Sequence, residues 1–119
     1  MFDFEKLEVY QLVKEQTNLV FKQIAKTEGL DSLIRDSWKN ASLQVLLQLV
    51  QASGRVSTSE KKSLLTAARG YVFECSAILD LLKASGEVDA EKFEELYNNY
   101  ERISKMLLGM FRSYESKVD

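Results

Sequence analysis

Few side chains in this sequence could do chemistry. Histidine is absent, which removes the commonest general acid–base group and the commonest metal ligand. Cys75 is the single cysteine, and it falls on the apolar spacing of a predicted helix, where a small buried residue is expected rather than a nucleophile. Serine and threonine nucleophiles would need an activating base, and none is evident. We therefore expect no catalytic residue and no enzymatic activity.

Four glutamates in the last third of the chain invite a di-metal interpretation, since helical bundles hold such sites with inward-facing Glu and Glu-x-x-His motifs. They are Glu91, Glu94, Glu95 and Glu101. These glutamates lie off the apolar face of their predicted helix, and no histidine is available to join them. We expect no metal site, no cofactor and no small-molecule substrate.

Seven basic residues form two groups that could contact phosphates. Lys14, Lys22 and Lys26, with Asn18 between the first two, follow a four-residue repeat along the first predicted helix. The second group consists of Arg55, Lys61, Lys62 and Arg69. An ordinary solvated helix face would look the same, so both interpretations stay open. Repeated around an oligomer, however, weak patches would act at a high effective concentration.

Arg69 and one further charged residue, Glu74, lie in the middle of one predicted helix. Their spacing of five residues does not place them on the same helix face. We expect separate ion pairs to neighbouring helices, with pairing between subunits or contact with a ligand as the alternative.

Four helices must position these side chains. Apolar spacing predicts them at residues 4–26, 32–53, 58–84 and 90–116. The predicted N-terminal caps are Asp3, Asp31, the capping box from Ser57 to Glu60, and Asp89. The chain has no proline, as long uninterrupted helices require. Short connections make successive helices antiparallel. We therefore predict an all-α, antiparallel up-down-up-down four-helix bundle that forms a single domain over residues 1–119.

The inner faces of these helices follow from the same spacing. The third helix is predicted to turn inward Leu64, Ala68, Tyr71, Cys75, Ile78 and Leu82. The inner face predicted for the second helix includes Trp38, Ala41, Val45, Gln48 and Ala52.

The first two helices carry more apolar residues than a bundle core needs. No charged residue occurs from Asn40 to Gly54. Apolar residues off the inner faces are Val9, Leu12, Leu19, Leu43, Leu46, Leu47, Leu49 and Val50. A larger, fully packed core would account for these residues. We favour instead an oligomer interface that contains all of these residues except Leu49. A large exposed apolar patch would otherwise reduce solubility.

The remaining whole-chain properties argue against several classes of protein. The net charge of −2 is not the strong basic excess of a typical nucleic-acid-binding protein. The first residues do not resemble a signal peptide, and no apolar run approaches the roughly 20 residues of a membrane span. A lone cysteine forms no internal disulfide and fits a reducing compartment. We expect a cytoplasmic protein without membrane contact.

Short segments spread over nearly the whole chain resemble one protein family. The segments are residues 4–10, residues 53–58, Ala68-Arg69-Gly70 with Glu74, residues 86–88 and residues 105–107. In combination they are similar to the four-helix-bundle proteins encoded in intervening sequences of bacterial 23S ribosomal RNA genes. The resemblance implies a bacterial, non-enzymatic protein that forms a ring-shaped homopentamer.

One stretch departs from this family. Its members commonly carry a proline followed by an Asn-Ile-Ala-Glu-Gly run in the second helix, where this chain has Leu46-Leu47-Gln48-Leu49-Val50-Gln51-Ala52. The replacement makes the helix straighter and more apolar.

Two functional hypotheses follow. The first is an oligomeric protein that binds structured RNA, or an accessory factor of a ribonucleoprotein. The alternative is a protein–protein adaptor. It includes the accessory protein of a diversity-generating retroelement, which has the same fold and binds a reverse transcriptase, but that group tends to be strongly basic and this chain is not.

Overall fold

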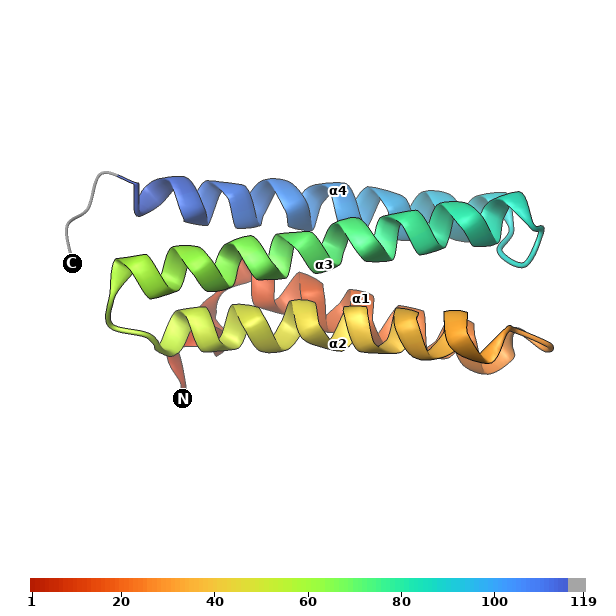
Figure 1. Cartoon of the computed structure of the whole chain (residues 1–119), viewed down its shortest axis with the longest axis horizontal. Coiled ribbons are helices and arrows are strands. Elements are labelled where there is room, and N and C mark those ends of the chain that lie inside the picture. The colour runs from red at the N-terminus through yellow and green to blue at the C-terminus, as the bar shows by residue number, and fades with distance from the viewer. Residues whose placement is uncertain (116–119) are drawn as a thin grey trace.

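The computed structural model describes residues 1–115, and over that range the chain is helical. A short 3-10 turn, η1 (Asp3–Lys6), precedes four α-helices. These are α1 (Glu8–Lys26), α2 (Ser32–Gly54), α3 (Thr58–Ala84) and α4 (Ala90–Ser113). Successive helices run in opposite directions and lie side by side as one elongated bundle (Figure 1). The predicted all-α, antiparallel four-helix bundle is confirmed.

The first helix begins later than predicted, and the Asp3 cap is wrong. Residues Asp3–Lys6 form η1, in which the backbone N–H of Phe2 donates to the Glu5 carboxylate at 2.8 Å. The ring of Phe4 packs edge-on against Tyr10, with 4.9 Å between the centroids. Leu7 has extended backbone angles and separates the two elements. The local contacts of Phe2 and Phe4 therefore replace a continuous helix from residue 4.

The other three predicted caps are present. Asp31 accepts hydrogen bonds from the backbone N–H groups of Leu33 and Ile34, and Asp89 accepts one from Lys92 at 2.8 Å. The hydroxyl of Ser57 accepts one from Glu60. Each acceptor satisfies an N–H group that the first turn of a helix leaves without a partner.

The last helix ends at Ser113, and residues 114 and 115 form a turn. The predicted end near residue 116 is therefore too late, and residue 116 itself lies outside the described range.

At the other end of the bundle, Gly86 closes α3 with φ of 83°, a left-handed conformation that glycine adopts without strain. The N–H of Glu87 then donates to the Leu82 carbonyl at 2.9 Å, which fixes the tight turn into α4.

The core differs from the predicted faces by small rotations. On α3, Leu65, Val72 and Leu79 are at most 1% exposed, whereas the predicted Leu64, Tyr71 and Ile78 are half-buried. On α2, Leu49 is fully buried and Gln48 is half-buried, the reverse of the prediction. Helix α3 packs against both α2 and α4, so it buries a wider face than one 3-4 stripe supplies.

Buried hydrogen bonds between distant helices fix how the bundle is assembled. The indole N–H of Trp38 on α2 donates to the hydroxyl of Tyr100 on α4 at 3.0 Å. The side-chain amide of Gln16 on α1 donates to the Leu96 carbonyl of α4 at 2.9 Å and accepts from Asn99. Because unpaired buried polar groups are costly, these bonds select one rotation of each helix.

None of the helices in residues 1–115 is long and apolar enough to cross a membrane.

Candidate functional site

The single cysteine lies deep in the core. Cys75 is fully buried, and its sulfur lies 3.7 Å from the Ser42 hydroxyl. Burial raises the pKa of the Cys75 thiol to about 11. Burial also raises the pKa of the Tyr100 hydroxyl well above its usual value, although the hydrogen bond from Trp38 opposes this. At neutral pH both side chains are therefore uncharged and pack in the core. A nucleophilic cysteine must be a thiolate, so Cys75 does not meet that requirement.

These two buried acids predict a loss of stability in alkali. In the unfolded chain the thiol and the phenol ionise near their ordinary pKa values, while the folded chain keeps both protonated. Unfolding therefore releases protons, and the free energy of unfolding falls by about 1.4 kcal/mol per pH unit for each group between its unfolded and folded pKa values. For Cys75 that window runs from 9.0 to about 11. Urea titrations at several pH values across this window measure the free energy of unfolding. In Cys75→Ala, this free energy should fall less steeply with pH. Equal slopes in both proteins would contradict it.

The glutamates that suggested a metal site lie on the outside of α4. Glu91, Glu94, Glu95 and Glu101 are all exposed. Lys92 binds Glu95 at 2.7 Å, as an ordinary surface pair. Within residues 1–115, no three His, Cys, Asp or Glu side chains lie close enough together to hold a metal ion.

The predicted oligomer interface is only partly on the surface. Val9 and Leu12 are 4% and 7% exposed, so they belong to the core of this bundle and their assignment to an interface is wrong. They are covered because η1 and the neighbouring helices close over the start of α1. Leu19, Leu46 and Val50 are half-buried.

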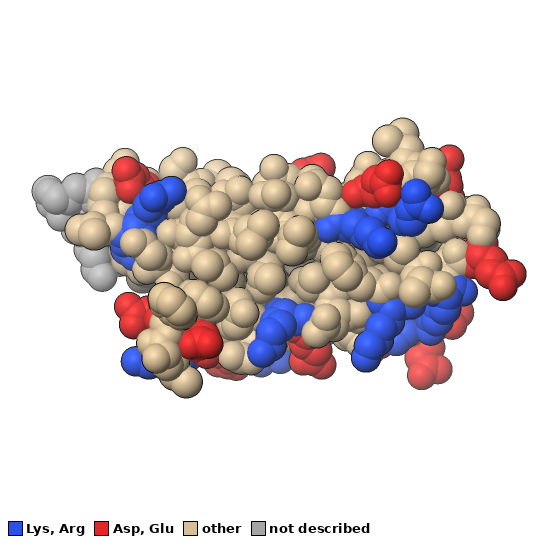
Figure 2. Space-filling view, turned by 90° about the horizontal axis from the view of Figure 1, so that it is seen from below, with Lys and Arg blue, Asp and Glu red and all other residues tan. Residues whose placement is uncertain are grey.

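Two leucines of the predicted interface remain on the outside. Leu43 and Leu47 are 41% and 40% exposed, one turn apart on α2. Figure 2 shows the face formed by α1 and α2, where charged side chains gather at the ends of α2 and along α1, and the surface over the middle of α2 is uncharged. We call Leu43, Leu47 and the half-buried Leu46 and Val50 the α2 ridge.

The structure does not bring the two basic groups together. Lys14, Lys22 and Lys26 are exposed on α1, which packs against α2 and α4. The second group belongs to α3 and the turn before it. Two of its members have structural roles: Lys61 donates to the carbonyl oxygens of Ala52 and Ser53 and so caps the end of α2, and Arg55 pairs with Glu60.

Of the other two members, Arg69 lines a groove between α3 and α4, and Lys62 lies beside Phe111, which lines that groove. The groove consists of two adjoining hollows, of about 300 and 360 Å³. Arg69 and Phe73 line both hollows. The first is lined mainly by apolar side chains of Leu65, Leu107, Leu108 and Phe111, with Thr66 and Gly70. The second adds Ser76, Tyr97, Tyr100, Glu101, Ser104, Lys105 and Val72.

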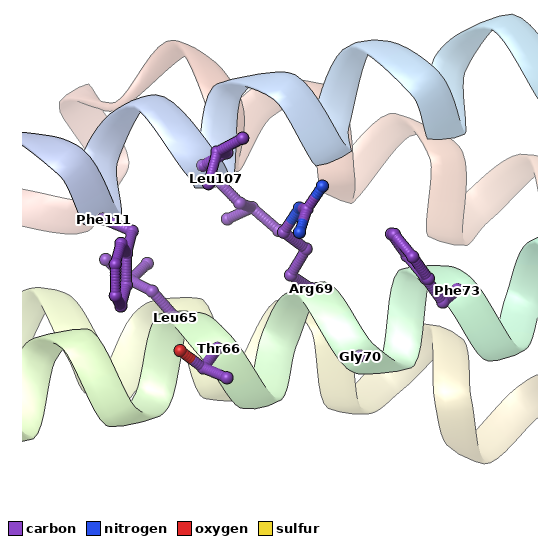
Figure 3. A pocket seen from close by; sticks show the side chains of 8 residues that line it. Leu65, Thr66, Arg69, Gly70, Phe73, Leu107 and Phe111 are labelled. Atoms are coloured by element: carbon purple, nitrogen blue, oxygen red, sulfur yellow. The ribbon is translucent and has the colours of Figure 1, made fainter.

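Arg69 crosses this groove. Figure 3 shows its side chain reaching from α3 toward α4, between Leu107 and Phe73. Its Nε donates to the Ser104 hydroxyl of α4 at 3.1 Å, and its guanidinium lies 5.0 Å from the centre of the Phe73 ring. Among the described residues, no carboxylate lies within ion-pair distance of Arg69, and Glu74 is exposed. The ion pairs expected for Arg69 and Glu74 are therefore absent over residues 1–115.

One further cation of the groove lies beside an aromatic ring. The ammonium of Lys62 lies 5.9 Å from the centre of Phe111. Lys105, exposed on α4, lines the second hollow together with Tyr97. Sequence reasoning missed Phe73, Tyr97, Lys105 and Phe111. The signal was present for one pair, since Arg69 and Phe73 are four residues apart off the core face.

Comparison with known proteins gives a consistent picture. The sequence profile of the 23S rRNA-intervening sequence proteins matches residues 5–109. A crystal structure from Bacteroides thetaiotaomicron, described as a protein of unknown function from the S23 ribosomal protein family, has the same fold with a TM-score of 0.82. It is 16% identical, and the match covers 87% of this chain and 98% of that one. No curated protein matches the sequence.

Proposed function

Since the chain belongs to the 23S rRNA-intervening sequence protein family, we propose that it is a non-enzymatic, oligomeric protein that binds structured RNA through the α3–α4 groove. The observation that carries the proposal is Arg69, a half-buried cation without a carboxylate partner among residues 1–115, in a groove also lined by Lys105 and flanked by Lys62. A partly desolvated guanidinium gains most from an anionic partner, and phosphate oxygens match its geometry.

The local charge explains how a chain with a net charge of −2 could bind RNA. Lys62, Arg69 and Lys105 contribute three positive charges, and Glu101 is the one acidic residue among those that line the two hollows. A single groove of this kind gives weak binding. In an oligomer, such as the homopentamer expected from the resemblance, several grooves would engage one RNA at a high effective concentration.

We expect RNA affinity to depend on these three cations and on salt. The variant Lys62→Gln/Arg69→Gln/Lys105→Gln should weaken binding of a labelled RNA hairpin at low salt. It should also reduce the slope of log affinity against log salt by about two, because three phosphate contacts are lost. The matched control is Lys14→Gln/Lys22→Gln/Lys26→Gln, which removes the same charge from α1. Fluorescence anisotropy between about 50 and about 200 mM salt measures both.

Two results would contradict this proposal. One is the absence of hairpin binding by the wild-type protein at low salt. The other is an equal loss of affinity in both triple variants, which would mean that net charge matters and the groove does not.

The α2 ridge supports a second candidate, a protein–protein adaptor, because exposed leucines on an uncharged surface favour a protein contact. We propose self-association as the main use of this ridge, with docking of a reverse transcriptase or another protein as the alternative. A cytoplasmic location goes with both proposals, since the lone cysteine needs no oxidising compartment.

A further inference from the structure

We propose that the α3–α4 groove takes unpaired nucleotides, with a base stacked on Phe73 and the adjacent phosphates held by Arg69 and Lys105. This inference rests on the proposed RNA binding and specifies its form, namely single-stranded RNA or the loop of a structured RNA, rather than duplex.

The first argument is the placement of Phe73. Its side chain is 57% exposed, although it lies in the middle of α3, which packs against both α2 and α4. It lines both hollows of the groove, so a planar group bound there can stack on the part of the ring that the Arg69 guanidinium leaves uncovered. Exposed aromatic rings in a basic groove are the usual stacking platforms for single-stranded nucleic acids.

The second argument is the repetition of the pattern along the groove. A cation accompanies an aromatic ring at Lys62 and Phe111, and again at Arg69 and Phe73. Tyr97, which is 38% exposed, provides a third ring in the hollow that Lys105 lines. A groove that offers both rings and cations suits a strand that carries both bases and phosphates. A duplex hides the faces of its bases, so it cannot use the rings.

The third argument distinguishes RNA from a docked helix. A partner helix would need one continuous apolar trough to receive its apolar stripe. Arg69 interrupts the trough, because it crosses from α3 to Ser104 on α4 and divides the groove into two compartments. The compartments also contain the hydroxyls of Thr66 and Ser76, which donate to carbonyls of their own helix and can accept hydrogen bonds from ribose or base edges.

The test uses a labelled oligoadenylate of about 12 nucleotides, within the site sizes known for stacking grooves, and its duplex with the complementary strand. Phe73→Leu keeps an apolar side chain and every charge, but it removes the stacking face. We expect it to raise the Kd for the single strand by about tenfold, as the loss of one stacked base predicts. The Kd for the duplex should stay unchanged.

The matched control is Phe21→Leu. Phe21 on α1 is 38% exposed and also has a cation, Lys39, 5.9 Å from its ring centre, but it lies outside the groove. This variant should bind the single strand as the wild-type protein does. Circular dichroism of both variants confirms that the bundle is intact.

Four outcomes would overturn the inference. If wild-type protein binds single strand and duplex equally, or if Phe73→Leu has no effect, the stacking proposal fails while RNA binding stands. If Phe73→Leu dissociates the oligomer in light scattering, a second copy of the chain fills the groove. If no RNA of either form binds, the proposed function fails as well.

Discussion

Replacing Leu49 by glutamate is expected to unfold the protein, whereas the same change at Leu47 should leave the bundle folded and abolish its self-association. Leu49 is fully buried and Leu47 is 40% exposed on the same helix. A carboxylate at Leu49 would lie in the core without a partner, which costs several kcal/mol. That loss is comparable with the total stability of a small domain, about 5–15 kcal/mol.

At Leu47 the carboxylate would remain hydrated in the monomer. In an assembly built on the α2 ridge, it would be desolvated opposite an apolar surface, and the interface would be lost. Circular dichroism reports the fold, and light scattering coupled to size-exclusion chromatography reports the mass. The control is Leu81→Glu, since Leu81 is 54% exposed on α3, outside the ridge.

The outcomes separate the two uses of the ridge. Monomeric Leu47→Glu with oligomeric Leu81→Glu supports self-association through α2. An unchanged mass in Leu47→Glu contradicts that role and leaves the ridge to a different protein partner. A folded Leu49→Glu variant would contradict the helix rotation described for α2.

The second large effect is expected at Trp38. Its side chain is fully buried and donates to Tyr100 across the bundle. Trp38→Ala should lower the free energy of unfolding by about 3–5 kcal/mol, since it leaves a large cavity and removes the donor for the Tyr100 hydroxyl. Leu33→Ala, on the same helix but 74% exposed, should cost less than about 0.5 kcal/mol. Urea denaturation followed by circular dichroism measures both.

A double-mutant cycle isolates the hydrogen bond in this cost. Trp38→Phe removes the indole donor to the buried Tyr100 hydroxyl, and Tyr100→Phe leaves the buried indole N–H without its acceptor, so each should cost about 1–3 kcal/mol. The double variant removes both groups and should cost less than the sum by at least about 0.5 kcal/mol. Strictly additive losses would show that the two groups do not stabilise each other.

The fold was predictable because its determinants are local. Caps at Asp31, Ser57 and Asp89 depend on residues within one turn of each other, and the helix periods are read along the chain. The start of α1 was not predictable in this way. It depends on the contacts of Phe2 and Phe4, which are made in place of the Asp3 cap.

The groove could be predicted only in part, for a different reason. Arg69 was recognised as a phosphate-binding candidate from its basic neighbours. Its partner across the groove, Ser104, and the lining residue Lys105 are more than 30 positions away. Their proximity depends on the register between α3 and α4, which buried contacts in the core decide. The same limit explains Val9 and Leu12, whose burial depends on the helices that pack over them.

The start of the chain and the end of α4 lie at the same end of the bundle (Figure 1). A bundle with an even number of antiparallel helices returns the chain to the end where it began. A domain or tag joined at the start of the chain, or directly after α4, would therefore begin at that end, beside the connection between α2 and α3. The long sides of the bundle, with the α2 ridge and the α3–α4 groove, would stay open. The bundle can therefore be attached to a surface or to another protein at one end, while its long sides remain accessible to other molecules.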